Sequence, residues 1–525
     1  MRVVAGCFFL LITKIDLLVN GFDWKDIEGT YFLTSVKNFL GIPGCPSAGS
    51  VFAITSMIAD RLSILQPGVP RVSLSDQILL NCVANQSTDS CIHSLPLETI
   101  LQHINASDGI PDRTCMGYRA KKEECSVENT CVNCLPGNPT AHCTPRTSFI
   151  KYPISDFGEV NMELVELEIE TNGPVACEFV DGSHGTLVGF RKNYFSVKRD
   201  LGVYHGDLGF DLVIKGGIKR CFQVTVNRPY RYHVPKHLLG NSYNNSIRSY
   251  ARCSHRNDQP IMSKSRRRLL PIDELPPIFN WGNQSGKCLL TPMQSHHNGE
   301  GYCGACWAMA SSSTFSDRLK IKRGGLSVPD VFVSPQLTVD CVKTSQSDGC
   351  NGGNAHDAFE FFVKHGSVDE TCDSWLGTGE RNLCSATGCT SCDAQGICSD
   401  VEDTKFTTYF ASDFGHLKGE QAMMNDLFSH GPIDCGIATN SALSEDFVGD
   451  SIICDNTTEP KKWSIDHDIS VVGWGEEHGL KYWVIRNSWG SHWGNNGFAK
   501  VCRGQNAPDG NMLLEKDCSW VLPKL

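Results

Sequence analysis

The sequence predicts an α+β fold that occurs twice in tandem. In the second half, a helical pattern follows Cys306, cysteine-dense loops occupy the middle, and the apolar, β-rich segments DISVVGWG and YWVIRNSWG come last. Helices followed by strands are typical of α+β domains. The first half repeats this order at an offset near 257 residues, which indicates a duplicated domain.

Matching segments along both halves carry the repeat. FDWKDIEGTYFLT, from Phe22, aligns with FNWGNQSGKCLLT, from Phe279, and NCVANQSTDSC aligns with DCVKTSQSDGC. Further on, DGIPDRTC matches HGSVDETC, and NGPVAC matches HGPIDC. The cysteines keep their spacing, with Cys125, Cys131 and Cys134 corresponding to Cys384, Cys389 and Cys392. We expect a signal peptide at 1–20, a first domain at 21–240, a basic linker at 241–275 and a second domain at 276–525.

The two segments outside the copies have distinct compositions. Arg2 precedes the apolar run VVAGCFFLLI, which resembles the hydrophobic core of a signal peptide. From Arg228 to Arg268, ten Lys or Arg residues stand against one acidic residue, Asp258. The motif SKSRRRLL near the end of this stretch fits either a processing site for a trypsin-like or furin-like protease or a solvated basic loop.

The composition restricts the class of protein. A formal net charge of -11 argues against nucleic acid or an anionic membrane as the main partner, and we expect neither. The 26 cysteines favour a disulfide-forming compartment, so we expect a secretory protein that resides in a lysosome-like or vacuole-like compartment or outside the cell. Glycosylation candidates are the sequons at Asn85, Asn105, Asn244, Asn283 and Asn456.

The segment GYCGACWAMA places Cys306 where a helix should begin. A helix N-terminus biases a thiol toward the reactive thiolate. Such a nucleophile needs a base, and the base needs an orienting group. His467 in IDHDISVVGWG and Asn487 in IRNSWGSHWG stand beside apolar runs, and Trp489 is placed to cover their hydrogen bond. We therefore expect Cys306, His467 and Asn487 to form a catalytic site, although His467 taken alone would fit an ordinary strand-edge histidine better.

Residues 250–525 resemble the papain family of cysteine peptidases and, within it, the lysosomal carboxypeptidases. The match is carried by CGACWAMA, DRLKIKRGG, CNGGN, DETC, GPIDCGI, VVGWG and YWVIRNSWG. The resemblance implies two disulfide-rich papain-like domains, each with a helical and a β-barrel-like subdomain. It implies that the second domain hydrolyses peptide or protein substrates through Cys306, His467 and Asn487, that Gly352 and Gly353 bind the substrate backbone, and that no metal or organic cofactor takes part.

The loop before the nucleophile, MQSHHNGEGYCGAC, departs from the family pattern. The family's oxyanion-hole glutamine falls on Gln294, which lies 12 residues before Cys306. The base and its orienting group follow 161 and 181 residues after the cysteine, more than the ~130 to 150 expected, which indicates inserted loops. His296 or His297 best matches the histidine that captures a C-terminal carboxylate in the carboxypeptidases. A protonated imidazole there favours an exopeptidase, whereas loss of that function would leave an open endopeptidase cleft.

The remaining cysteines are expected to form disulfides. Cys389-x-x-Cys392 has zinc-ribbon spacing, but an oxidising compartment favours a disulfide over a metal ligand. RSYARCSHRND resembles a prosegment whose cysteine blocks the active-site thiol, and Cys253 occupies that place. Because thirteen cysteines besides Cys306 fall in the second copy, Cys253 fits equally well as the partner of one of those. The family resemblance implies disulfides at Cys303, Cys350, Cys341 and Cys384, with Cys303 joined to Cys350.

The first copy lacks the residues of the expected catalytic site. An ungapped offset places Gly49 opposite Cys306 and Phe210 opposite His467, and CIHS replaces CNGG. We expect an inactive pseudopeptidase that binds in cis or to another protein. The alternative for the whole chain is a non-catalytic binding or matrix protein of papain-like fold, which the intact motifs of the second copy oppose.

Overall fold

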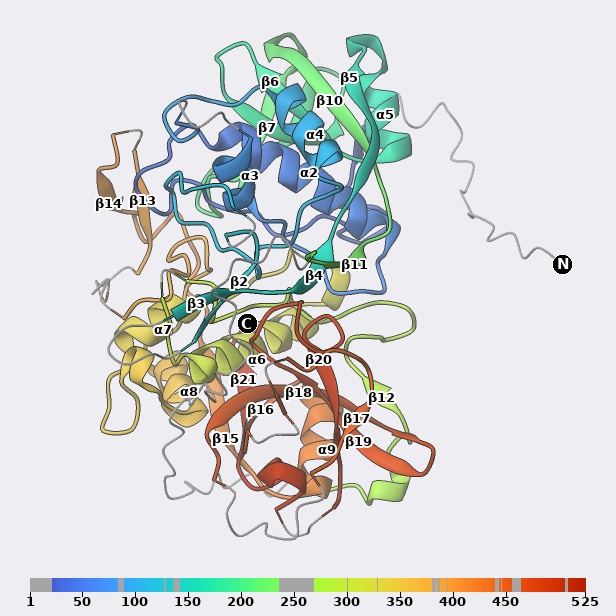
Figure 1. Cartoon of the computed structure of the whole chain (residues 1–525), viewed down its shortest axis with the longest axis vertical. Coiled ribbons are helices and arrows are strands. Elements are labelled where there is room, and N and C mark those ends of the chain that lie inside the picture. Colours follow the sequence, from blue (N-terminus) through green and yellow to red (C-terminus); the bar gives the residue numbers. More distant parts are fainter. Residues whose placement is uncertain are drawn as a thin grey trace, which may run out of the picture.

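In the computed structural model, the two halves of the chain lie one above the other along the long axis (Figure 1). The first half occupies the upper part of that view and the second half the lower part. The structure describes residues 21–83, 89–126, 129–135, 142–235, 269–299, 301–327, 329–379, 384, 388–393, 395–439, 443–444, 446–455, 464–505 and 509–525.

In the first half, α2, α3 and α4 precede an antiparallel sheet and α5 lies between β5 and β6 in the chain. The strands of this sheet are arranged in the order β5-β10-β6-β7-β8-β9, with β1 paired to β7. The small ladders β2-β3 and β4-β11 lie at the junction of the halves (Figure 1). The helices are α2 (Gly49–Leu65), α3 (Asp76–Cys82), α4 (Leu97–Ala106) and α5 (Val165–Asn172). The strands are β1 (Phe22–Asp23), β2 (Val132–Leu135), β3 (His142–Pro145), β4 (Ser148–Lys151), β5 (Ile154–Val160), β6 (Val175–Phe179), β7 (His184–Phe190), β8 (Tyr194–Lys198), β9 (Phe210–Ile214), β10 (Ile218–Val226) and β11 (Tyr230–His233).

The second half repeats this plan, with the sheet order β15-β21-β16-β18-β19-β20-β17 and β12 paired to β18. The predicted α+β class, present twice, is therefore confirmed. The helices are α6 (Cys306–Lys322), α7 (Pro335–Cys341), α8 (Ala355–Lys364) and α9 (Glu420–His430). The strands are β12 (Phe279–Asn280), β13 (Thr390–Cys392), β14 (Cys398–Asp400), β15 (Ala411–Leu417), β16 (Ile433–Ile437), β17 (Ile452–Ile453), β18 (His467–Glu477), β19 (Leu480–Arg486), β20 (Phe498–Cys502) and β21 (Cys518–Pro523).

Five disulfides of each half join corresponding positions. Disulfides of this kind stabilise a fold mainly by restricting the unfolded chain. The first half has Cys45–Cys91, Cys82–Cys125, Cys115–Cys131, Cys134–Cys143 and Cys177–Cys221. The second has Cys303–Cys350, Cys341–Cys384, Cys372–Cys389, Cys392–Cys398 and Cys435–Cys518, and adds Cys454–Cys502.

A buried ion pair holds the central helix of each half to its sheet. Asp60 in α2 accepts from Lys198 Nζ at 3.0 Å, and Asp317 in α6 accepts from Arg486 at 2.6 Å. All four side chains are at most 3% exposed. Because a buried charge without a partner is costly, each pair fixes the position of its helix.

The strand register corrects one expected correspondence between the halves. Gly189 in β7 pairs with β1 as Gly473 in β18 pairs with β12, so Ser183, and not Phe210, corresponds to His467. Only residues 180–183 separate β6 from β7, whereas residues 438–466 separate β16 from β18. Because of this insertion, residues in the later strands of the two halves correspond at an offset larger than 257.

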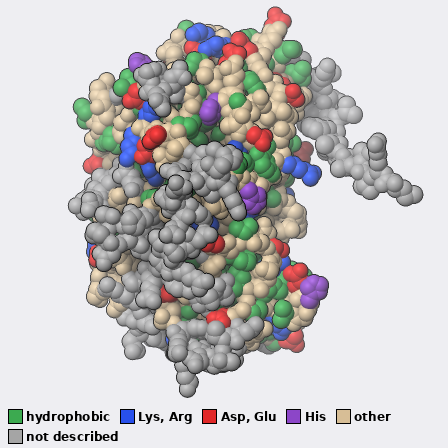
Figure 2. All heavy atoms as spheres, in the orientation of Figure 1, with side chains coloured by type: hydrophobic (Ala, Val, Ile, Leu, Met, Phe, Trp, Pro, Cys, Tyr) green, Lys and Arg blue, Asp and Glu red, His purple; other side chains and the backbone are tan. Residues whose placement is uncertain are grey.

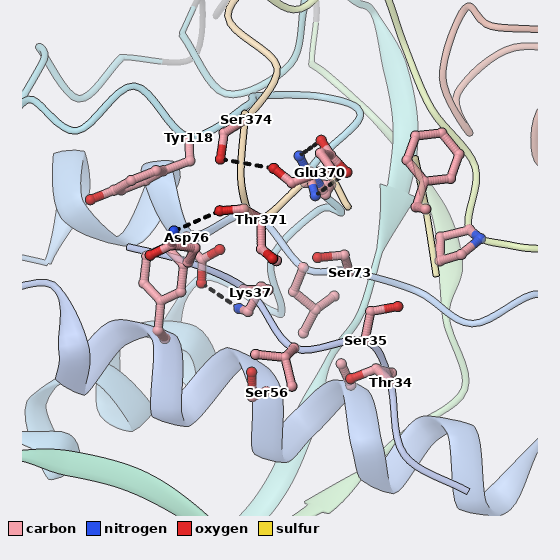
Figure 3. A pocket seen from close by; sticks show the side chains of 18 of the residues that line it. Thr34, Ser35, Lys37, Ser56, Ser73, Asp76, Tyr118, Glu370, Thr371 and Ser374 are labelled. Atoms are coloured by element: carbon pink, nitrogen blue, oxygen red, sulfur yellow. Dashed lines mark hydrogen bonds and ion pairs between the residues drawn. The ribbon is translucent and has the colours of Figure 1, made fainter. Parts of the chain in front are cut away.

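The junction of the halves encloses a cavity of about 80 Å³ (Figure 3). Side chains from both halves line it, among them Lys37, which pairs with Asp76 at 2.7 Å, and Arg113, which pairs with Glu370 at 2.6 Å. On the face seen in Figure 2, basic and acidic side chains are interspersed over the described residues. Within the part of the chain that the structure describes, no helix combines the length and apolarity needed to cross a bilayer.

Candidate active site

Cys306 is the first residue of α6 and is fully buried. The Cys303–Cys350 disulfide precedes it, and Gly304 N donates to the Cys350 carbonyl at 2.9 Å, which fixes the entry to the helix. Cys306 is itself disulfide-bonded. Since every other described cysteine except the free, buried Cys288 has a described partner, the partner of Cys306 lies outside the described residues.

His467 and Asn487 meet at the start of β18 and just beyond the end of β19. His467 Nε2 lies 2.8 Å from Asn487 Oδ1, so this ring nitrogen carries the proton and donates it to the amide oxygen. The other ring nitrogen, Nδ1, has no hydrogen-bond partner among the described residues. Burial lowers the pKa of His467, and the bond to Asn487 offsets part of that effect. The neutral imidazole therefore has a free lone pair at Nδ1, as a general base requires.

Trp489 covers this hydrogen bond, and α6 lies beside the strand that carries His467. The indole stacks on the His467 ring with centroids 4.8 Å apart. The Thr314 hydroxyl of α6 donates to Ser470 Oγ of β18 at 3.2 Å. The sequence thus brings the helix that begins at Cys306 against the strand that begins at His467.

Gly352 and Gly353 lie beside the first turn of α6. Both are buried, and a Cβ atom at Gly353 would lie 2.6 Å from the Trp307 indole. No side chain larger than hydrogen fits at Gly353 while Trp307 occupies its present position. The absence of side chains leaves the backbone of this segment as its only hydrogen-bonding surface.

The loop histidines are buried rather than exposed. His296 Nδ1 lies 2.9 Å from Ser488 Oγ, and His297 Nδ1 lies 2.7 Å from Asn133 Oδ1 of the first half. Burial, followed by the charges of neighbouring histidines, holds the pKa of each imidazole well below its ordinary value. In this closed arrangement neither histidine is the exposed cation that the loop sequence led us to expect.

The other predicted site residues lie in several places. Gln294 lines the cavity between the halves, and its carbonyl accepts from Gly490 N at 3.2 Å. The structure joins Cys341 to Cys384. Asn105 and Asn283 are exposed, whereas the prosegment candidate Cys253 and the sequons at Asn85, Asn244 and Asn456 lie outside the described residues.

Two cysteines and a histidine lie close together, but their chemistry does not suit a metal ion. Cys115, Cys131 and His492 bring their ligand atoms within 4.8 Å of one another. The two sulfurs, however, are joined in a disulfide, which removes the thiolates that a metal would need. His492 Nδ1 lies 3.9 Å from Cys131 Sγ as a packing contact.

Two residues that contact the loop histidines, Ser488 and Asn133, are not among the site residues predicted from the sequence. Ser488 follows Asn487 directly, so its position beside the site could have been noticed. Asn133 lies 164 residues before His297, in the cysteine hairpin of the other copy, and no pattern along the chain links the two. Only the packing of one copy on the other brings Asn133 to this loop.

The first half has structural counterparts of the three site positions, but different residues occupy them. Gly49 begins α2 as Cys306 begins α6. Lys198 corresponds to Arg486 at the end of matching strands, so the next residue, Arg199, takes the place of Asn487. With Ser183 opposite His467, the first half has no nucleophile, base or orienting amide at these three positions.

The chain is similar to known proteins over both of its halves. The family model described as papain family cysteine protease matches residues 18–199 and 275–520. Cathepsin Z of Onchocerca volvulus is 34% identical over 257 residues, which cover 48% of this chain and 79% of that protein. Cathepsin K of Mus musculus is 31% identical over 221 residues, or 42% of this chain and 58% of that protein.

Among solved structures, procathepsin L 3 of the Tenebrio molitor larval midgut aligns with a TM-score of 0.38 and 20% identity. That alignment covers 50% of this chain and 73% of the other. The family match includes both copies and most of the chain. The chain therefore belongs to the papain family of cysteine proteases and contains its domain twice.

Proposed function

We propose that the second half is a cathepsin Z-like cysteine peptidase, present here in a closed precursor form, with Cys306 as nucleophile, His467 as base and Asn487 as its orienting group. The observation that carries the proposal is the 2.8 Å bond from His467 Nε2 to Asn487, which leaves Nδ1 unpartnered among the described residues. A base oriented in this way accepts the thiol proton and later delivers it to the leaving amine.

The reaction requires the Cys306 thiol to be released from its disulfide. Once reduced, the thiolate attacks the scissile carbonyl, and the C–N bond breaks as the imidazolium protonates the leaving amine. Water activated by the same imidazole then hydrolyses the thioester. The Cys306 backbone N–H and the Gln294 amide are proposed to stabilise the oxyanion. Cys253 is the proposed prosegment thiol that blocks Cys306 before activation.

The first test of this proposal uses the two cysteines that no described cysteine pairs with. After mild reduction, the wild type should hydrolyse a peptide substrate and Cys306→Ala should not. Cys288→Ala is the matched control, because burial raises the pKa of the Cys288 thiol, which packs with Leu290 and Val472. Activity that survives in Cys306→Ala would refute the assignment of the nucleophile.

We propose carboxypeptidase specificity because His296 and His297 stand in the loop beside His467. An imidazolium that binds a terminal carboxylate favours peptides with free C-termini at acidic pH. Matched peptides with free and amidated C-termini should differ by about fivefold to a hundredfold in kcat/KM, the worth of one charge-assisted hydrogen bond. Equal cleavage of the two peptides would favour the endopeptidase alternative.

A further inference from the structure

The two halves contact each other through a reciprocal, two-fold-like interface. Cys134 N in β2 donates to the His297 carbonyl at 2.8 Å, and Cys392 N in β13 donates to the Leu40 carbonyl at 2.9 Å. These are corresponding contacts, since Cys392 matches Cys134 and Leu40 matches His297 in the repeat. Figure 1 shows the same exchange, with β13 and β14 beside the upper half and β2 and β3 at the edge of the lower half.

Two further contacts also repeat across the interface. Ser491 N donates to Thr114 Oγ1 at 2.9 Å, and Val203 N donates to Thr371 Oγ1 at 3.2 Å. An interface in which each surface contacts its own counterpart is the isologous arrangement of a two-fold dimer. The halves thus associate as two subunits of a dimer would, within one chain.

Charged residues at the interface favour pairing of a first half with a second half over pairing of two second halves. Arg71 pairs with Asp330 at 2.8 Å, and Arg113 pairs with Glu370 at 2.6 Å. The segments VPRV and VPDV match in the repeat, as do DRTC and DETC, so each pair joins two corresponding positions. Corresponding residues that touch lie near the two-fold axis. Two second halves would place Asp against Asp and Glu against Glu there, which like-charge repulsion opposes.

The β2-β3 hairpin of the first half contacts the second half beside the candidate active site. Asn133 Oδ1 of the β2-β3 hairpin accepts from His297 Nδ1–H at 2.7 Å. His297 stacks on Trp489 with centroids 6.0 Å apart, and Trp489 stacks on His467. Asn298 Nδ2 donates to the Arg113 carbonyl at 2.7 Å in the same loop. The first half therefore holds the loop that flanks the base.

The reciprocal contact, made by the β13-β14 hairpin on the first half, does not lie beside a comparable set of histidines. Ser391 occupies the position of Asn133 in the other hairpin and contacts Tyr204. Leu40 stands where the second half has His297, and Ser183 stands where it has His467. The interface is symmetric in its backbone contacts, but only one of its two hairpins faces a candidate catalytic site.

We propose that the first half is a built-in wall of the peptidase cleft, and that Asn133 is a positioning residue that fixes His297 for the substrate's C-terminal carboxylate. The proposal rests on the carboxypeptidase function stated above. By accepting the Nδ1–H, Asn133 leaves Nε2 as the nitrogen that takes up the second proton and, in the imidazolium, donates it to the carboxylate. Nε2 has no hydrogen-bond partner among the described residues.

Kinetics of the reduced, full-length protein test this proposal. With Asn133→Ala, the KM for a free-acid peptide should rise about twofold to tenfold, the effect of one hydrogen bond, while kcat and the kinetics of the amidated peptide stay unchanged. Asn133→Asp keeps the acceptor oxygen and should keep the low KM. Ser391→Ala is the matched control from the other hairpin and should behave as the wild type.

The outcomes separate this inference from the proposed function. An unchanged KM in Asn133→Ala, or an equal change in Ser391→Ala, would overturn the inference while the carboxypeptidase function stands. A wild type without preference for free C-termini would overturn both, and a wild type without any hydrolysis would refute the peptidase itself. These three results are distinct.

A second pair of variants tests the wall without touching the hairpin. Arg113→Glu places two acidic groups near the axis, and their repulsion should loosen the first half. Cleavage of an internally quenched peptide blocked at both ends should then rise by about threefold or more. The exchange Arg113→Glu with Glu370→Arg restores opposite charges and should restore the wild-type rate. Equal rates in all three proteins would contradict a wall formed by the first half.

Discussion

The two halves of this chain share one scaffold and differ in their chemistry. Helices α2 and α6 are both 17 residues long and buried, and each carries an arginine that binds matching carbonyls. Arg61 Nε donates to the Pro174 carbonyl at 2.8 Å, and Arg318 Nε donates to that of Pro432 at 2.6 Å. The first half thus has the residues that hold the fold but not those that the proposed reaction needs.

One pair of substitutions shows how the halves diverged locally. In the second half, Gly353 is required because a Cβ there would meet Trp307. In the first half, Ser50 stands in the place of Trp307 and Ser94 in that of Gly353, and their hydroxyls lie 3.3 Å apart. Because Ser50 is much smaller than Trp307, the loop of the first half can carry a side chain at position 94. The first half therefore lacks both the glycine pair expected to bind substrate and the indole that excludes a side chain from it.

His467→Ala should have the largest effect on activity. Removing the base should lower kcat by about 10⁴- to 10⁶-fold, as loss of a catalytic triad member does elsewhere. Ser183→Ala, at the matching position in the first half, should leave kcat unchanged. Single-turnover kinetics of the two variants measure this difference, and a similar loss in both would contradict the assignment of chemistry to one half.

Lys198→Met should have the largest effect on stability. It leaves the Asp60 carboxylate buried without its cation, at a cost of about 3 to 5 kcal/mol. Arg486→Met should cost a comparable amount in the second half, because Asp317 is equally buried. Urea unfolding, combined with hydrogen exchange in α2 and α6, would locate each loss. If only one of the two variants lost stability, the ion pairs of the two halves would not be equivalent.

Asp369→Asn should alter the pH dependence of stability. Burial raises the pKa of Asp369 to about 6, above its ordinary value of 3.8. The folded protein therefore binds the proton more tightly than the unfolded chain, so this contribution is complete below pH 3.8 and is lost as the pH rises through 6. The loss is at most ~3 kcal/mol. Thermal unfolding between pH 4 and 7 should show a flatter profile in the variant, and a steeper one would contradict the sign.

Asn487→Ala should have the smallest effect of the four. The imidazole remains but loses its orienting bond, so kcat should fall by about fivefold to a hundredfold. Arg199→Ala, its counterpart in the first half, should not change kcat. A loss in Asn487→Ala as large as that in His467→Ala would show that the amide does more than orient the ring.

Much of the fold and the candidate site could be predicted from the sequence. The duplicated cysteines and the order of elements predicted two α+β copies, and the motif around Cys306 predicted the helix start. The ungapped offset failed at His467, because the insertion between β16 and β18 cannot be located without the strand register. The odd cysteine of the second copy is Cys288, which packs with Leu290 and Val472, and cysteine counting gives no sign of that.

What the sequence could not provide is the contact between the copies. The burial of His296 and His297 depends on the packed site as a whole, and the Asn133 contact depends on a hairpin more than 150 residues away. The charge differences at positions 71 and 330 and at positions 113 and 370 were visible in the aligned repeat. Their meaning required the knowledge that corresponding positions touch.

The most direct measurement is the labelling of thiols by an active-site-directed epoxide, mapped by mass spectrometry with and without mild reduction. We expect no labelling of the unreduced protein, because Cys306 is disulfide-bonded, and labelling of Cys306 alone after reduction. Labelling should vanish in His467→Ala, whose thiol lacks its base. Labelling of any cysteine between residues 21 and 240, or none at Cys306 after its disulfide is opened, would contradict the division of the chain into one inactive and one catalytic half.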